Sequence, residues 1–382
     1  MRRLRLWLFR QKRRGGASDQ IGDSSIARTG RVRIKVRWTR RRYASPLPKK
    51  RTAATTTELT EATIKRSNGL HDLFVRHPDN PILTADRWPY PANSVFNPGA
   101  VQLPSGETLL LVRVEGRQGA SHLTVARSAD GATNWRIDST PTMTPLSEEH
   151  PEEVWGIEDP RIVWLPELER YAITYTAYSR NGPLVALATT SDFKTFDRHG
   201  AITAPEDKDA ALFPRRFDGR WCLVHRPVPT SPGSKANMWL SFSPDLKHWG
   251  DQMVLMEARD GSAWDAGKIG LSPPPLETEE GWLIVYHGVR NTSSGGIYRM
   301  GLALLDRDDP RRVIRRATDW VFGPVEPYEF AGDVSNVVFS CGMVADADSG
   351  QLRLYYGAAD TRIGLATADI TELLDWLRTS AS

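Results

Sequence analysis

Residues 158–196 carry three consecutive segments that decide the fold, namely EDPRIVWL (158–165), YAITYTAYS (171–179) and LVALATTSDFKTF (184–196). Each contains about the four to eight apolar or aromatic residues of a strand, and turn residues separate one segment from the next. The third segment runs into a hairpin with a Phe, and no helical spacing of apolar residues occurs in between. This stretch therefore predicts a small antiparallel sheet.

The same three-part pattern occurs five times from about residue 90 onwards, with copies roughly 50–70 residues apart. Such a repeat is typical of architectures built from one repeated unit. Each small sheet buries both faces only by packing against neighbouring sheets, so the five copies predict an all-β, five-bladed β-propeller over residues 67–382. The other four copies begin at Asn97, Asp209, Leu271 and Asn336.

Only the C-terminal segment DITELLDWLRTS (369–380) has apolar residues at helical spacing. Ile370, Leu373, Leu374 and Leu377 would share one face of a helix, which predicts a short helix that caps the propeller. No run of eighteen or more apolar residues occurs, which argues against a transmembrane helix.

The net charge of +4 averages over two unlike parts of the chain. Residues 1–66 hold 20 Lys and Arg against 4 Asp and Glu, a net charge of +16, which leaves −12 for residues 67–382. This charge density predicts a disordered basic extension. Basic tails can bind nucleic acid or anionic membranes, but we favour a dispensable extension and expect neither partner. Cys222 and Cys341 are too few for a disulfide framework, which favours a cytoplasmic protein.

Side chains with acid, base or ligand chemistry recur at two positions of the repeat, the start of the first strand and the end of the second. In a propeller these positions usually face the central channel, so equivalent residues converge there. The first-strand starts supply Asn97, Glu158, Asp159, Arg161, Lys208, Asp209, Asp265, Lys268 and Asn336. The second-strand ends supply Arg113, Glu115, Tyr178, His225, Arg226, Tyr286, His287 and Asp360. Each alone has an ordinary explanation, such as a turn ion pair or a hydrogen-bonded core histidine, but their coincidence favours one shared site.

The cations of this set predict an anion site, because Arg and Lys are the usual ligands of phosphate. No Gly-rich nucleotide-binding loop occurs, so the expected anion is inorganic phosphate. Aromatic faces that suit a sugar ring are supplied by Trp155, Tyr178, Trp264 and Tyr286. A sugar beside phosphate predicts phosphorolysis, which needs an acid but no carboxylate base, because phosphate is itself an anionic nucleophile. Asp159 is the candidate acid, whose pKa Glu158 would raise and Arg161 would lower.

Seven phrases along the chain form a further pattern: GIEDPRI (156–162), DKDAALFP (207–214), HRP (225–227), WDAGKIG (264–270), GWLIVYHGV (281–289), NVVFSCG (336–342) and LYYGAADTRIGLATA (354–368). Together and in this order they resemble glycoside hydrolase family 130, the β-mannoside phosphorylases and related β-mannosidases. The resemblance runs from about Asn93 to Leu374, and residues 1–66 have no counterpart. One phrase alone is unspecific, whereas seven in order are specific.

This resemblance implies a five-bladed propeller and an inverting mechanism, with phosphate as co-substrate and no cofactor. It implies Asp159 as the proton donor, acting through the mannose 3-hydroxyl, while phosphate attacks the anomeric carbon from the opposite face to give α-mannose 1-phosphate. It assigns phosphate contacts to Lys208, Arg226, Lys268 and His287. It assigns sugar contacts to Asn93, Ser94, Arg113 and Asp360, to which the aromatic Tyr286 is added. The chain has DKD at 207–209 where the family form is expected to be NKD, a difference that should affect acceptor fit.

Other interpretations stay open at this point. An inverting β-mannosidase of the same family would need Glu115, Asp209 or Asp265 as base. A non-catalytic carbohydrate-binding propeller would bind mannosides unchanged. A family 43-like glycosidase uses three carboxylates and does not need the cations. No His or Cys spacing indicates a metal site. The preferred partners are a β-mannoside oligosaccharide and phosphate, and a homo-oligomer is compatible with the sequence.

Overall fold

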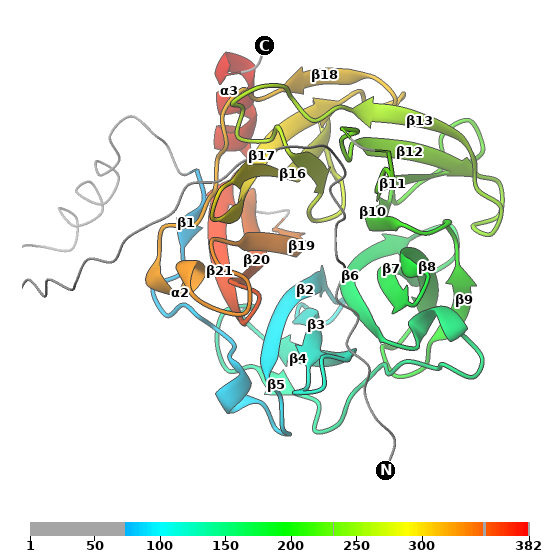
Figure 1. Cartoon of the computed structure of the whole chain (residues 1–382), viewed down its shortest axis with the longest axis vertical. Helices are drawn as coiled ribbons and strands as arrows, with labels where there is room; N and C mark the ends of the chain where they lie inside the picture. Colours follow the sequence, from blue (N-terminus) through cyan, green and yellow to red (C-terminus); the bar gives the residue numbers. More distant parts are fainter. Residues whose placement is uncertain (1–72, 232, 347–348, 381–382) are drawn as a thin grey trace, which may run out of the picture. The chain divides into compact units, whose positions relative to one another are not determined.

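A computed structural model shows an all-β architecture of small antiparallel sheets arranged around a common centre (Figure 1), which confirms the predicted propeller. The structure describes residues 73–231, 233–346 and 349–380. These lie in the second of two units of the chain, Met1–Thr63 and Ile64–Ser382. The predicted basic extension over residues 1–66 lies outside the described residues.

The five blades follow one another along the chain. The first blade contains β2 (Ser94–Gln102), β3 (Thr108–Glu115), β4 (Ser121–Ser128) and β5 (Arg136–Ile137). The second contains β6 (Gly156–Leu165), β7 (Arg170–Ser179), β8 (Gly182–Thr190) and β9 (Asp197–Ala201), and the third contains β10 (Asp207–Leu212), β11 (Trp221–Pro227), β12 (Met238–Ser243) and β13 (Gly250–Met256). The fourth contains β14 (Lys268–Leu271), β15 (Leu276–Thr278), β16 (Gly281–Thr292), β17 (Gly295–Leu305) and β18 (Val313–Arg316). The fifth contains β19 (Val338–Ala345), β20 (Gln351–Ala358), β21 (Arg362–Asp369) and the early strand β1 (Val75–Arg76).

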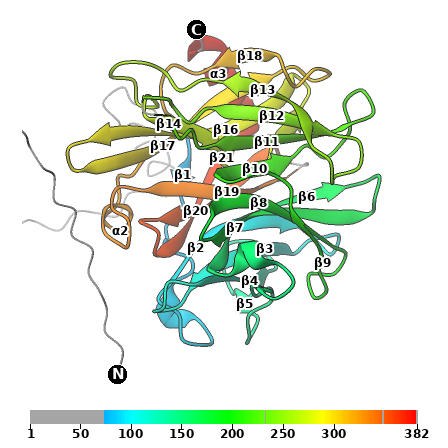
Figure 2. The same cartoon turned by 45° about the vertical axis from the view of Figure 1, so that its right-hand side comes forward.

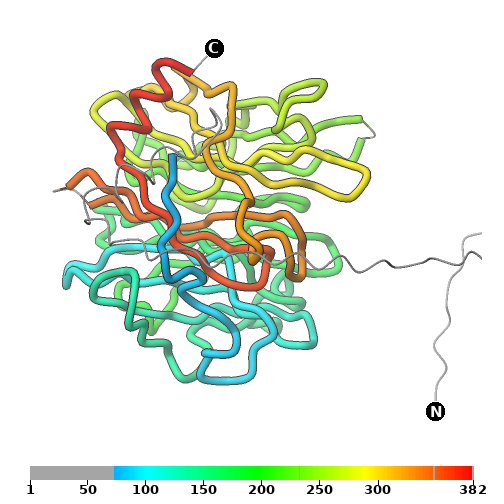
Figure 3. Tube along the Cα trace, turned by 90° about the vertical axis from the view of Figure 1, so that its left-hand side faces the viewer, coloured from blue at the N-terminus to red at the C-terminus, as the bar shows by residue number. Residues whose placement is uncertain are grey.

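Strand β1 completes the last blade, so the two ends of the described chain meet in one sheet. Val75 pairs with Thr367 of β21 in antiparallel register. A side-chain ion pair of 2.7 Å joins Arg76 to buried Glu329, which lies in the short helix α2 (Pro327–Phe330). Figure 3 shows this blue N-terminal segment beside the red C-terminal strands. The sequence repeat did not indicate which strand closes the ring.

Alternating strand residues explain why the strands are apolar on both faces. In β3, Leu109 and Leu111 pack in the cluster shared with the second blade, whereas Leu110 and Val112 pack in the cluster shared with the fifth. Successive side chains of a strand point to opposite faces, so an inner strand between two neighbouring sheets must be apolar throughout. The predicted C-terminal helix is confirmed as α3 (Ile370–Ser380), which buries Leu373, Leu374 and Leu377.

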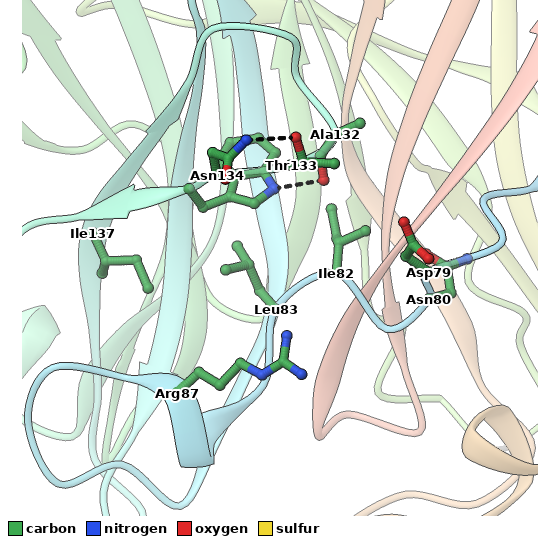
Figure 4. A pocket seen from close by; sticks show the side chains of 10 residues that line it. Asp79, Asn80, Ile82, Leu83, Arg87, Ala132, Thr133, Asn134 and Ile137 are labelled. Atoms are coloured by element: carbon green, nitrogen blue, oxygen red, sulfur yellow. Dashed lines mark hydrogen bonds between the residues drawn. The ribbon is translucent and has the colours of Figure 1, made fainter.

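Two features lie outside the regular blade pattern. The hairpin formed by β16 and β17 is longer than the other hairpins of the described residues and extends beyond its sheet (Figure 2). A pocket of about 610 Å³ lies between residues 79–87, which include the 3₁₀ turn η1 (Ala85–Arg87), and residues 132–137 of the first blade (Figure 4). None of the predicted site residues lines this pocket.

Candidate active site

Three side chains reach the centre from bulged strand starts. Asn97, Asp159 and Asp209 have φ angles of 45°, 50° and 55°, in the left-handed region. Each lies within a register irregularity of the first two strands of its blade, between Phe96 and Gly99, Glu158 and Arg161, or Lys208 and Ala211. Among residues other than Gly, Asn and Asp adopt this conformation most readily, and bulges re-aim side chains next to functional sites. The recurring Asn or Asp of the repeat is thus a backbone requirement as well as a chemical one.

The bulged strand starts and the second-strand ends enclose one pocket of about 370 Å³. Seven of the ten predicted site residues line it: Arg113, Asp159, Lys208, Arg226, Lys268, His287 and Asp360. Its other lining residues are Asn97, Glu158, Tyr178, Asp209, Tyr298, Val334, Val337 and Phe339.

One end of the pocket holds the candidate acid. Oδ1 of Asp159 accepts hydrogen bonds of 3.0 Å from Nδ2 of Asn97 and from Nη1 of Arg113. Arg113 also pairs with Glu158 at 3.1 Å and with Glu115. Burial by itself would lower the pKa of Arg113, but the three carboxylates raise it. We call Asn97, Arg113, Asp159 and Asp360 the acid end.

Asp360 is a carboxyl group of the acid end with a raised pKa. Burial first, and then the neighbouring carboxylate of Asp159, raise the pKa of Asp360 to about 7, although Arg113 opposes this shift. A carboxyl group with this pKa is partly protonated near neutral pH and can donate as well as accept a hydrogen bond.

The guanidinium of Arg161 does not form an ion pair with the Asp159 carboxylate among the contacts of the described residues. Nη1 of Arg161 donates to the backbone oxygen of Asp159 at 3.3 Å, while Nη2 lies 3.4 Å from Oδ1 of Asp209. Its remaining bonds go to the backbone oxygens of Leu271 and Ser272 in the fourth blade. Fully buried Arg161 therefore ties three blades together instead of pairing with the candidate acid.

A second group of pocket residues carries hydrogen-bond donors, and we call Lys208, Arg226, Lys268 and His287 the cation end. Nε of Arg226 donates to Oδ2 of Asp209 at 2.7 Å, and Nε2 of His287 lies 3.4 Å from the same oxygen. Nζ of Lys208 lies 3.7 Å from Oε2 of Glu158. Nζ of Lys268 lies 5.0 Å from the ring centroid of Tyr298.

The charges at the cation end follow from burial and pairing. Burial would raise the pKa of Asp209, but Arg226, His287 and Arg161 hold it well below its usual range, so this carboxylate stays ionised. Burial lowers the pKa of His287 despite the nearby Asp209. This shift favours the neutral imidazole of His287, so the positive charge of the cation end comes from Lys208, Arg226 and Lys268.

Residues 75–379 match the sequence family described as beta-1,4-mannooligosaccharide phosphorylase. The chain belongs to glycoside hydrolase family 130. Its enzyme class is that of a glycoside phosphorylase. A β-1,4-mannooligosaccharide phosphorylase of Ruminococcus albus is 34% identical over 316 residues, which cover 81% of this chain and 92% of the relative. A β-1,2-mannobiose phosphorylase of Listeria innocua is 38% identical over 261 residues, which cover 68% and 70% of the two chains. The structure of a Listeria innocua β-1,2-mannobiose phosphorylase with β-1,2-mannobiose superposes with a TM-score of 0.71 at 30% identity, covering 80% and 99% of the chains.

Three predicted sugar-binding residues of this family 130 enzyme lie outside the pocket. Tyr286 is fully buried, where its hydroxyl donates to Oδ2 of Asp265 at 3.0 Å and its ring packs against Trp264. It precedes His287 in β16, so the alternation of the strand sends one side chain to the core and the other to the pocket. Trp264 lies in the loop before β14 and is also a buried core residue, so its ring is not a sugar platform.

Asn93 directly precedes β2 and Ser94 is its first residue, so both come before the bulge at Asn97. Asn93 is exposed and donates from Nδ2 to Oδ2 of Asp333 at 3.1 Å. Ser94 is fully buried, and its hydroxyl has no hydrogen-bond partner among the described residues.

Asp207, the first residue of the DKD phrase and the one that differs from the expected NKD form, has a structural role that we did not expect. Asp207 is buried and does not line the pocket, where an effect on acceptor fit would arise. Its carboxylate bonds instead to His225 and to the backbone of Arg226. His225 is therefore a hydrogen-bonded core histidine, as one of the ordinary explanations had it.

Four lining residues were missed from the sequence: Tyr298, Val334, Val337 and Phe339. Tyr298 lies in the extended hairpin and Val334 in the loop before the fifth blade, positions outside the two used in our repeat analysis. The ring of His287 packs 4.7 Å from that of Phe339 and 6.0 Å from that of Tyr298, centroid to centroid. Phe339 lies near the start of β19, the first strand of its blade. The search for acid, base and ligand side chains missed it because it is apolar.

The donor set of the pocket suits an anion more than a metal. Within residues 73–231, 233–346 and 349–380, no group of three or more His, Cys, Asp or Glu is arranged to hold a metal ion. In the same residues no helix is long and apolar enough to cross a membrane. The pocket thus combines an acid end and a cation end around a volume of about 370 Å³.

Proposed function

We propose that this enzyme catalyses the inverting phosphorolysis of β-mannosides, with α-mannose 1-phosphate and a shortened acceptor as products. The observation that carries the proposal is the division of the pocket into an acid end and a cation end. A phosphorylase needs an acid that protonates the leaving oxygen, and positive or N–H groups that bind the phosphate nucleophile. The acid end supplies the first and the cation end supplies the second.

Asp159 is the general acid of the proposed reaction. As the bond between the anomeric carbon and the glycosidic oxygen breaks, its proton passes through the mannose 3-hydroxyl to that oxygen. A phosphate oxygen forms the new bond to the anomeric carbon from the opposite face, which inverts the configuration. Arg113 and Asn97 orient the Asp159 carboxyl, because both donate to its Oδ1.

The carboxylates considered as a hydrolytic base are all engaged elsewhere, which favours phosphate over water as nucleophile. Asp265 is fully buried and paired with Arg259 and Arg316 at 2.9 and 2.7 Å. Glu115 pairs with Arg113. Asp209 is held ionised by strong pairing, so it is a poor proton acceptor.

The acceptor side is assigned to the aromatic pair at the edge of the pocket. Tyr178 lines the pocket, and its ring meets that of Trp155 edge to face with centroids 5.3 Å apart. Trp155 is 47% exposed, unusually open for so large an apolar side chain. Exposed aromatic faces next to a sugar pocket suit the second sugar of a β-mannoside oligosaccharide.

The test is sugar release from β-1,4-mannobiose, β-1,2-mannobiose and a β-1,4-mannotriose with and without phosphate. We expect α-mannose 1-phosphate, identified by NMR, only when phosphate is present, and the preferred substrate gives the linkage. Equal release of mannose without phosphate would contradict the proposal and identify a β-mannosidase. Binding without turnover in either condition would identify a carbohydrate-binding protein.

A further inference from the structure

Three buried polar side chains of the third blade form a row behind the cation end. Nδ1 of His225 lies 2.6 Å from Oδ2 of Asp207, and Nε2 of His225 lies 2.7 Å from Oγ of Ser241. The residues come from β10, β11 and β12, and their exposed fractions are 3%, 1% and 0% in that order. None of the three lines the pocket.

The order of groups is that of a Ser-His-Asp hydrolase triad, but burial excludes this chemistry. A nucleophilic serine must meet its substrate, and the Ser241 hydroxyl lies inside a sheet. The hydrogen bonds among Asp207, His225 and Ser241 instead give each polar side chain of the row a partner. The carboxylate accepts from Nδ1–H, which leaves Nε2 to accept from the Ser241 hydroxyl when the imidazole is neutral. The function of the row must therefore lie in the neighbouring residues that it positions.

The row is joined directly to the cation end through Arg226. The backbone N–H of Arg226 donates to Oδ1 of Asp207 at 3.1 Å, while its side-chain Nε donates to Oδ2 of Asp209 at 2.7 Å. The two aspartates that flank Lys208 thus hold Arg226 at its backbone and at its guanidinium. Lys208 and Arg226 are themselves cross-strand partners.

The local backbone explains why such support is needed. The pairing of β10 with β11 is irregular between Lys208 and Ala211, where Asp209 has a φ of 55°. A bulge of this kind weakens the ladder at the point where both cations enter the pocket. Side-chain bonds from Asp207 and His225 replace part of the rigidity that the regular ladder would supply.

We propose that Asp207, His225 and Ser241 are positioning residues that fix Arg226 and Lys208 in the geometry required to bind phosphate. The inference rests on the proposed function, in which these two cations contact phosphate. It assigns a role to the first Asp of the DKD phrase and to the His of HRP, although neither reaches the pocket.

The test is steady-state phosphorolysis at saturating mannoside with varied phosphate. In Asp207→Ala both acceptor oxygens are lost, and we expect the KM for phosphate to rise about tenfold, with kcat at saturating phosphate changed less than twofold. In Asp207→Asn the amide oxygen can still accept from Arg226 while the amide N–H₂ donates to the other tautomer of His225, so KM should stay close to that of wild type and below the rise expected for Ser241→Ala. Ser241→Ala, which removes the far end of the row, should raise KM about threefold.

A matched control separates positioning from simple loss of stability. Tyr175→Phe removes a buried hydrogen bond of 2.7 Å to Glu153 in the second blade and should lower the melting temperature without changing the KM for phosphate. An unchanged KM in Asp207→Ala and Ser241→Ala, together with a raised KM in Arg226→Ala, would overturn the inference alone. An unchanged KM in Arg226→Ala would overturn the proposed phosphate site. If Asp207→Ala does not fold, Ser241→Ala decides between these outcomes.

Discussion

The two ends of the pocket are built from similar residue types but in opposite proportions. At the acid end, the single guanidinium of Arg113 meets three carboxylates, of Asp159, Glu158 and Glu115. At the cation end, Arg226 and His287 share one carboxylate, Asp209, while Lys268 faces the Tyr298 ring. Carboxylates outnumber cations at the acid end, whereas cations outnumber carboxylates at the cation end.

This difference shows how a pocket in an acidic body can bind an anion. Residues 67–382 carry a net charge of −12, yet Lys and Arg outnumber Asp and Glu in the third and fourth blades. Short-range pairing inside a buried site outweighs distant surface charge, which solvent and salt screen. The comparison predicts that substitutions at the acid end will lower kcat, whereas substitutions at the cation end will raise the KM for phosphate.

The largest effect is expected at the acid end. Asp159→Asn keeps the shape of the side chain but removes the acidic proton, so we expect kcat to fall by about 10³-fold, within the range of general acid catalysis. Mannoside affinity, measured by calorimetry, should change less than about threefold. A variant that retains turnover would move the acid elsewhere and remove the distinction between the two ends.

At the cation end we expect a different kinetic signature. Lys268→Met removes one charge that has no carboxylate within ion-pair distance among the described residues. The KM for phosphate should rise about 30-fold, whereas the KM for the mannoside should stay within about twofold, as for loss of a hydrogen bond to a charged group. A parallel rise of both constants would show that the two ends do not act separately.

The pH dependence of stability tests the crowding of carboxylates at the acid end. Burial and Asp159 raise the pKa of Asp360 to about 7 in the folded protein, above its unfolded value. The stabilising contribution of protonated Asp360 is therefore complete below the unfolded pKa and is lost as the pH rises to about 7. Relative to wild type, Asp360→Asn should gain about 2–3 kcal/mol in the free energy of unfolding between pH 5 and pH 8. A constant difference in urea unfolding across this range would show that Asp360 is not crowded by charge.

The sequence predicted the blades because their requirement is periodic. Inner strands such as β3 and β16 pack on both faces, so nearly every residue is apolar and the repeat is visible. The same periodicity brought seven predicted residues to the pocket, since bulged strand starts and strand ends recur once per blade.

The failures arise where a single residue step decides between core and pocket. Tyr286 and His287 are neighbours at a strand end, and only the three-dimensional alternation shows which one faces the phosphate side. Asp207 and Lys208 pose the same question at a strand start. Tyr298 comes from a hairpin whose length is particular to one blade, so no repeat could indicate it.

The smallest effect is expected at the edge of the pocket, outside both ends. Trp155→Ala removes a half-exposed ring that packs against Tyr178 and belongs to neither the acid end nor the cation end. Loss of one stacking contact of about 1 kcal/mol should raise the KM for a mannotriose about fivefold and the KM for a mannobiose less than twofold. Trp164→Ala is the matched control, because Trp164 is similarly exposed on β6, the strand that Trp155 directly precedes, and packs against Tyr171 instead. Equal effects of Trp155→Ala on both substrates would place the second sugar elsewhere and leave the acceptor side of the pocket unassigned.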